Sequence, residues 1–90
     1  MNLNRETDAY KAALAAELHR LRAASGLSMT RLAENAGLSQ PMIAFVEKEV
    51  KAPSVDSLYR LSRALGTTPG EILTTVDKAV TKERAKKHGS

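Results

Sequence analysis

The chain has 90 residues, which suits one small domain with a modest core, and it contains no cysteine, which excludes a disulfide framework and a cysteine-based metal site. Its net charge of +4 lies in residues 78–90, because residues 1–77 hold nine basic and nine acidic side chains, so charge alone is weak evidence for nucleic-acid binding. No apolar run approaches the roughly 18 residues of a membrane span and the first residues lack an apolar signal stretch, so we expect a cytoplasmic protein with no membrane partner.

The apolar residues follow helical spacing throughout, and no alternating strand pattern competes with it. The first helix is expected to begin near Thr7 or Asp8, either of which can serve as its N-cap, and to end near Ala24 before Ser25 and Gly26. Its inward stripe consists of four residues at intervals of four, four and three, namely Tyr10, Leu14, Leu18 and Leu21.

Two short helices follow the first one. Ser28 is expected to cap the second helix, which ends near residue 36 before Gly37. The third helix starts at Ser39 or Gln40, because Pro41 suits a first helical turn but disfavours helical geometry in the residue before it. Either Ser39 or Gln40 can therefore be the N-cap.

Two further helices complete the expected set. The fourth covers residues 55–65, with Ser54 as its cap and Gly66 as its stop. Residues 68–71 read as a capping box with proline at the first helical position, and the fifth helix continues from there toward Val80.

These elements predict an all-α fold, a compact bundle of about five helices in a single domain at residues 1–83. The remaining residues, 84–90, form a basic tail without apolar anchors and are expected to be disordered. Such a tail is either a solvated end or an arm that grips DNA phosphates.

In the middle of the chain, apolar and small residues are spaced as in a helix-turn-helix. Leu32 turns one face of the second helix inward, and Ala33 is small where two helices would cross closely. Gly37 permits a left-handed residue at the turn, and Ile43 and Val46 turn the third helix inward. Two helices joined in this way present the second one outward, as reading the major groove of DNA requires.

The same stretch resembles the phage-repressor-like family of helix-turn-helix transcriptional regulators, also called the Cro-like or xenobiotic-response-element type, over about residues 14–73. The residues that carry the resemblance are Leu21, Arg22, Leu32, Ala33, Ile43, Val46, Glu47, Pro53 and Ser54. It implies a lambda-repressor-like domain that binds double-stranded DNA at specific sequences, as a repressor or controller, and as a homodimer on a two-fold operator. The chain departs from the family at Met29, where many members have Gln, and at Glu49, where many have Gly.

Residues opposite Ile43 and Val46 on the third helix are the candidates for reading bases. About 100° of rotation per residue places Pro41, Ala44, Phe45 and Lys48 on that outer face, with Gln40 beside it at the helix start. The resemblance puts base-reading residues in this first turn, so Gln40 is the candidate for a paired hydrogen bond to adenine. Two alternatives stay open here: Phe45 can be a core residue, and Gln40 an ordinary exposed residue.

Contacts to DNA phosphates are expected beside the same helix. Ser28 and Ser39 stand at the N-termini of the second and third helices, where backbone N–H groups point outward, and Arg31 and Lys51 add positive charge. Lys48 can reach either a guanine or a phosphate.

Two further expectations concern structure and assembly. The resemblance implies a structural ion pair between Arg22 and Glu47, the alternative being two separately solvated charges. The apolar residues of the fifth helix form the expected dimer interface, unless some of them close the domain's own core; they are Ile72, Leu73, Val76 and Val80.

Nothing in the sequence predicts an enzyme. The two histidines, His19 and His88, lie near no cysteine or nucleophile motif, and no glycine-rich phosphate loop exists, so we expect no cofactor and no metal. His19 is expected on the surface. The alternative functions are an antitoxin, with a cognate toxin as its partner, and a protein-interaction module of the same fold. For a regulator, RNA polymerase is a further candidate partner.

Overall fold

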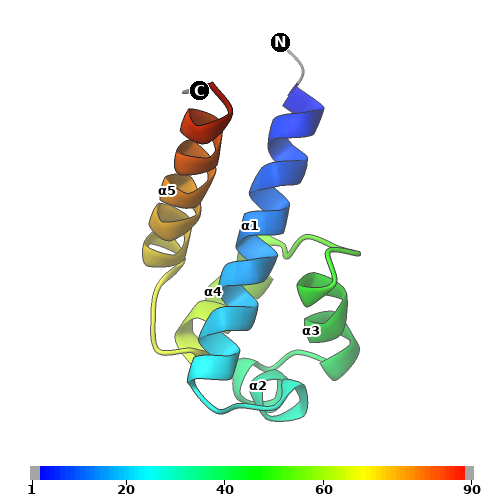
Figure 1. Ribbon diagram of the computed structural model, residues 1–90. Helices are drawn as coiled ribbons and strands as arrows, with labels where there is room; N and C mark the ends of the chain where they lie inside the picture. Colours follow the sequence, from blue (N-terminus) through cyan, green and yellow to red (C-terminus); the bar gives the residue numbers. More distant parts are fainter. Residues whose placement is uncertain (1–2, 89–90) are drawn as a thin grey trace.

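The computed structural model describes residues 3–88, with the side chains of residues 3–83, and arranges them in five helices (Figure 1). These are α1 (Leu3–Ala24), α2 (Met29–Ala36), α3 (Gln40–Glu47), α4 (Val55–Ala64) and α5 (Pro69–His88). The expected all-α fold is confirmed, since no strand occurs among the described residues. None of these helices is both long and apolar enough to cross a membrane.

Serine hydroxyls begin three of the helices, as the sequence predicts. Ser28 accepts the N–H of Arg31 at 3.0 Å, and Ser54 accepts that of Ser57 at 3.1 Å. At α3 the cap is Ser39, which accepts the N–H of Met42 at 3.3 Å, so Gln40 is the first helical residue and not the cap.

The two long helices differ from expectation at their ends. α1 begins at Leu3, and the hydroxyl of Thr7 donates to the carbonyl of Asn4 at 3.0 Å inside the helix and caps nothing. α5 runs to His88, so the backbone of residues 84–88 is helical where a disordered tail was expected; residues 89–90 lie outside the described part. The capping box before α5 is half formed, because the Glu71 N–H reaches the Thr68 hydroxyl at 3.2 Å while the Glu71 carboxylate accepts from the hydroxyl of Thr67.

All five helices contribute to one apolar core. Its members are buried to at least nine-tenths and comprise Leu14, Leu18, Leu32, Ala33, Ala36, Ile43, Val46, Leu58, Leu61, Ile72 and Val76. α1 packs against both α5 and α3, while α2 packs against α3 and α4. The α1 to α5 contact also carries a hydrogen bond, from the Tyr10 hydroxyl to the Asp77 carboxylate at 2.8 Å.

The composition of this core shows that the expected dimer interface was partly wrong. Ile72 and Val76 are each only 1% exposed, because they fill the space between α5 and the rest of the protomer. Leu73 and Val80 are half-buried and rest against the edge of the same core. Only these last two of the four residues retain surface that a partner could contact.

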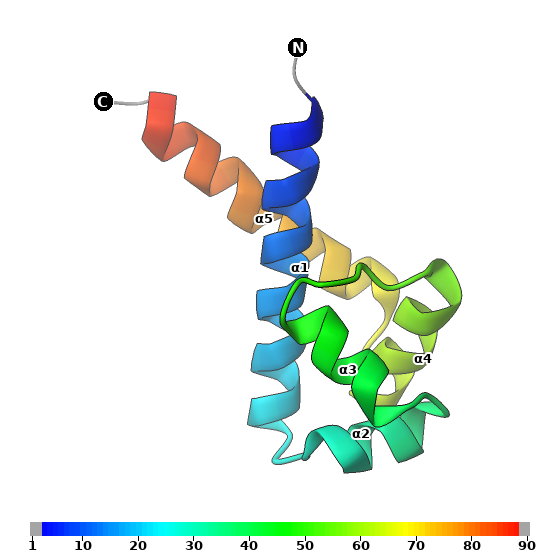
Figure 2. The same cartoon turned by 90° about the vertical axis from the view of Figure 1, so that its right-hand side faces the viewer.

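The molecule is elongated, with principal extents of 44 × 22 × 18 Å. The N-terminal end of α1 and the C-terminal end of α5 lie at one end, and α2 lies at the other (Figures 1 and 2). The basic end of α5 is therefore far from α2 within the same protomer.

Candidate nucleic-acid interface

The turn between α2 and α3 is built around Gly37. This residue has φ 70° and ψ 34°, the left-handed region that glycine enters at little cost, and its N–H closes the last turn of α2. The next N–H, of Leu38, donates to the carbonyl of Ala33 at 2.9 Å, which folds the chain back beneath the helix end. Ala33 itself is 3% exposed, so its small side chain lets the neighbouring elements approach closely.

α3 is anchored by one face and open on the other. Ile43 and Val46 are 1% and 3% exposed, and they bind the helix to the core. Phe45 is 46% exposed, which excludes the alternative that it is a core residue. Ala44 is half-buried, and the other predicted base readers, Gln40, Pro41 and Lys48, are exposed. All five residues thus keep solvent-accessible surface, four of them on α3 and Lys48 at its C-cap. α3 itself lies at the outside of the molecule (Figure 2).

The residues expected to contact phosphates lie at the start of α2, at the start of α3 and just after α3. Ser28, Arg31, Ser39 and Lys51 are all exposed. Ser28 and Ser39 already accept helix N–H groups, but a serine hydroxyl keeps its own proton to donate. The Arg31 guanidinium lies 3.8 Å from the Glu34 carboxylate, and both side chains are strongly exposed. Such a pair contributes little to stability.

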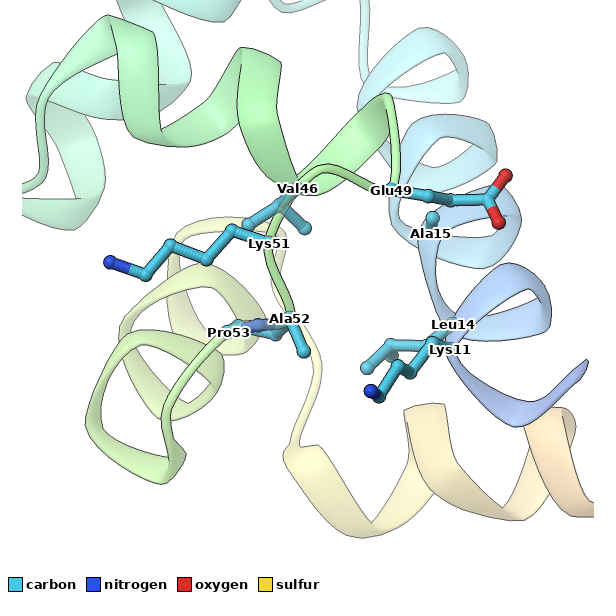
Figure 3. A pocket seen from close by; sticks show the side chains of 8 residues that line it. All are labelled: Lys11, Leu14, Ala15, Val46, Glu49, Lys51, Ala52 and Pro53. Atoms are coloured by element: carbon cyan, nitrogen blue, oxygen red, sulfur yellow. The ribbon is translucent and has the colours of Figure 1, made fainter. Parts of the chain in front are cut away.

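A small pocket lies between α1 and the segment that follows α3 (Figure 3). Its volume of about 20 Å³ holds roughly one water molecule, so it is too small for a metabolite. Figure 3 shows the ammonium group of Lys51 and the carboxylate of Glu49 pointing away from each other, one on either side of this segment. The Lys51 charge is therefore directed away from Glu49.

Glu49 has a strained backbone. Its φ of 62° is the only positive value among the non-glycine residues described, and it occupies the left-handed position just after α3. The N–H of Val50 donates to the carbonyl of Phe45 at 2.8 Å, which closes the end of the helix around this residue. The chain therefore makes with Glu49 a turn that glycine would make at little cost, and the glutamate adopts a left-handed conformation there.

The C-terminal end of α3 is tied to α1 by an ion-pair cluster. Nε and Nη2 of Arg22 donate to the two carboxylate oxygens of Glu47, at 2.6 and 2.9 Å, and the side chains are 14% and 6% exposed. Nη1 of Arg22 also donates to the carbonyl of Leu27 at 2.9 Å. Arg22 thus joins three segments, α1, the loop after it and α3.

His19 is the member of this cluster that sequence reasoning missed. It is exposed as expected, but its Nδ1 lies 2.8 Å from Oε1 of Glu47. The signal was available, because His19 and Arg22 are three residues apart on one helix and so share a face. Burial alone raises the pKa of Glu47 and is the largest single influence, but the hydrogen bonds from Arg22 and His19 outweigh it, so this pKa lies below its usual value.

A second unexpected contact lies at the other end of α3. Nε2 of Gln40 is 3.6 Å from the thioether sulfur of Met29, the first residue of α2. The sequence showed Met29 only as a departure from the family pattern. In space it adjoins the residue predicted to read adenine.

Comparisons with known proteins agree with this geometry. A helix-turn-helix family model matches residues 18–72. An uncharacterised helix-turn-helix-type transcriptional regulator of Sinorhizobium fredii, y4dJ, is 34% identical over 59 residues, which cover 66% of this chain and 77% of that protein. Two crystal structures of the clp gene regulator ClgR of Corynebacterium glutamicum superpose with TM-scores of 0.77 and 0.70 at 25% and 27% identity. The superpositions cover 88% and 78% of this chain, and 84% and 91% of the two ClgR chains.

Proposed function

Because the chain belongs to the helix-turn-helix family of DNA-binding transcriptional regulators, we propose that it recognises a specific double-stranded operator and represses or controls transcription there. The observation that carries the proposal is the exposed face of α3, mounted on the buried Ile43 and Val46. A helix held by one face and open on the other can enter the major groove without unfolding its support.

Each part of the interface has a separate role in this proposal. Gln40 reads an adenine edge, Phe45 and Ala44 contact thymine methyl groups, and Lys48 reaches a guanine or a phosphate. The N-termini of α2 and α3, with Ser28 and Ser39, contact phosphates and fix the register of α3 in the groove. Blocking promoter DNA in this way requires no catalytic group.

We also propose that two copies act together on a two-fold site. One helix-turn-helix buries little DNA surface, and two gain affinity when their recognition helices are about 34 Å apart. Support within the chain comes from a shallow groove between α1 and α5, lined mainly by small side chains such as Ala13, Ala16 and Ala79. Leu73 and Val80 on α5 are the half-buried apolar residues that a second copy could cover.

Selection of bound sequences from random DNA tests the proposal directly, because one assay reports the preferred site, its symmetry and its half-site spacing. Gln40→Ala should then cost about 1 to 3 kcal/mol on the selected site and little on random DNA. Lys51→Ala should weaken binding to both and reduce the salt dependence by about one counterion.

Lys78→Ala is the matched control for Lys51→Ala, since Lys78 is an exposed lysine on α5, away from α3. It should leave DNA binding nearly unchanged. If no sequence is enriched, specific recognition is refuted, and a toxin or another protein partner becomes the leading function for the same fold. Equal losses on selected and random DNA for Gln40→Ala would contradict its role as a base reader.

A further inference from the structure

We propose that Met29 is a positioning residue that determines base specificity: its thioether holds the Gln40 carboxamide in one of two orientations. The inference rests on the proposed function of Gln40 as a base reader. Its direct observation is the hydrogen bond from Nε2 of Gln40 to Sδ of Met29, at 3.6 Å. This contact joins the start of α2 to the start of α3, the two helix ends that face the DNA.

Packing against the core holds the Met29 sulfur in place. Met29 follows the Ser28 cap as the first residue of α2, and its half-buried side chain packs against the apolar core. The position of the thioether is thus set by the fold and is present before DNA binds.

The backbone of Gln40 is held equally firmly. It lies between the cap Ser39, whose hydroxyl accepts the N–H of Met42 at 3.3 Å, and Pro41, whose ring restricts the residue before it. What remains free is the side chain, including the rotation that exchanges its amide oxygen and nitrogen. At this terminal torsion both orientations are otherwise similar in energy.

The chemistry of the partner decides between the two orientations. A thioether sulfur carries lone pairs and no proton, so it can only accept a hydrogen bond. The Gln40 nitrogen therefore faces Met29, because the reversed amide would set the oxygen lone pairs against those of sulfur. The carbonyl oxygen and the second N–H of Gln40 then point away from Met29.

That pair of groups matches one base better than the others. The major-groove edge of adenine offers an N6 donor beside an N7 acceptor, which a carbonyl oxygen and one N–H satisfy together. Guanine offers two acceptors, which require two donors, and one Gln40 N–H is already engaged by sulfur. Met29 thus favours adenine over guanine at the Gln40 position. A glutamine in place of Met29 could accept or donate and would leave the orientation open.

The contact is tested first in the free protein. Nuclear Overhauser effects between the Gln40 side-chain amide protons and the Met29 methyl group are expected in the wild type, and the Gln40 amide resonances should shift in Met29→Leu. This substitution keeps the apolar volume and removes the acceptor. Met42→Leu is the matched control, a methionine that is also half-buried against the core but has no polar contact to Gln40. It should leave the Gln40 resonances in place.

The role is tested next on DNA, using the operator selected by the wild-type chain and its variants at the Gln40 position. The ratio of affinities for adenine and guanine should fall roughly fivefold in Met29→Leu, the factor for one ordinary hydrogen bond. The adenine to guanine affinity ratio should be unchanged in Met42→Leu. In a protein that already carries Gln40→Ala, adding Met29→Leu should not lower this ratio further. Met29→Lys places a donor at this position, so the amide should reverse and the preference should move toward guanine.

Each outcome decides the question. An unchanged adenine to guanine ratio in both Met29 variants, with the wild type still selecting a site, overturns this inference and leaves the proposed function standing. Absent Overhauser effects in the free protein overturn it without reference to DNA. A wild-type chain that selects no site overturns the proposed function and this inference with it.

Discussion

Replacing Arg22 with alanine should be among the most destabilising changes in this chain, because of what it leaves behind. Glu47 would keep a carboxylate that is 6% exposed, with only the exposed His19 as partner. The carbonyl of Leu27 would lose the donor that Arg22 supplies at 2.9 Å. Breaking a buried ion pair from one side costs about 3 to 5 kcal/mol, and we expect about 3 to 4 kcal/mol here because His19 remains.

Chemical denaturation and thermal melting measure this loss. For a domain of this size, 3 kcal/mol corresponds to a fall in Tm of roughly 15 °C. Arg60→Ala is the matched control, because Arg60 also pairs with a carboxylate through its Nε, that of Asp56 at 2.9 Å, but both side chains are exposed, at 48% and 74%. Solvation replaces such an exposed pair, so the control should melt close to the wild type.

A double-mutant cycle with Glu47→Ala identifies the pair as the cause. Removing both charges removes the orphaned carboxylate, so the double variant should be more stable than the sum of the two single effects predicts. Additive effects, or an Arg22→Ala variant that melts like Arg60→Ala, would refute the reasoning. DNA affinity should fall along with stability, since the cluster holds the C-terminal end of α3 to α1.

Three further predictions concern pH, backbone strain and assembly. The pKa of Glu47 is lowered in the folded state, so the unfolded chain binds the proton more readily, and the free energy of unfolding should decline as pH falls below the ordinary glutamate value of 4.5. Denaturant titrations at several pH values should show a smaller decline for Glu47→Gln than for the wild type. Equal declines in the two proteins would contradict the assignment of this pH dependence to Glu47. Glu49→Gly should raise the free energy of unfolding by about 0.5 to 1 kcal/mol, because it relieves the φ of 62°, whereas Glu49→Ala should strengthen DNA binding at low salt without that gain in stability. Val80→Asp should shift the sedimentation of the protein toward that of the monomer and weaken operator binding. Lys78→Asp, on the opposite side of α5, should leave the mass of the sedimenting species unchanged. A wild-type protein that is monomeric at high micromolar concentration would refute the dimer.

The helices of this protein were predictable because the signals that start and stop them are local. Ser28 and Ser54 cap helices, and Gly37 ends one, through hydrogen bonds and backbone angles that involve only neighbouring residues. The inward stripe of α1 and the buried pair Ile43 and Val46 follow from the helical repeat alone. These features, with the family resemblance, determined the fold class and the exposed face of α3 in advance.

Other features depended on which faces meet in space, and no local pattern specifies that. The same apolar spacing on α5 suits a core or an interface, and only the packing of α5 against α1 buries Ile72 and Val76 in the protomer. The contacts of His19 with Glu47 and of Met29 with Gln40 join residues 28 and 11 positions apart. Such contacts exist because the angles between helices bring particular side-chain atoms within hydrogen-bond reach, and those angles are set by the whole core at once.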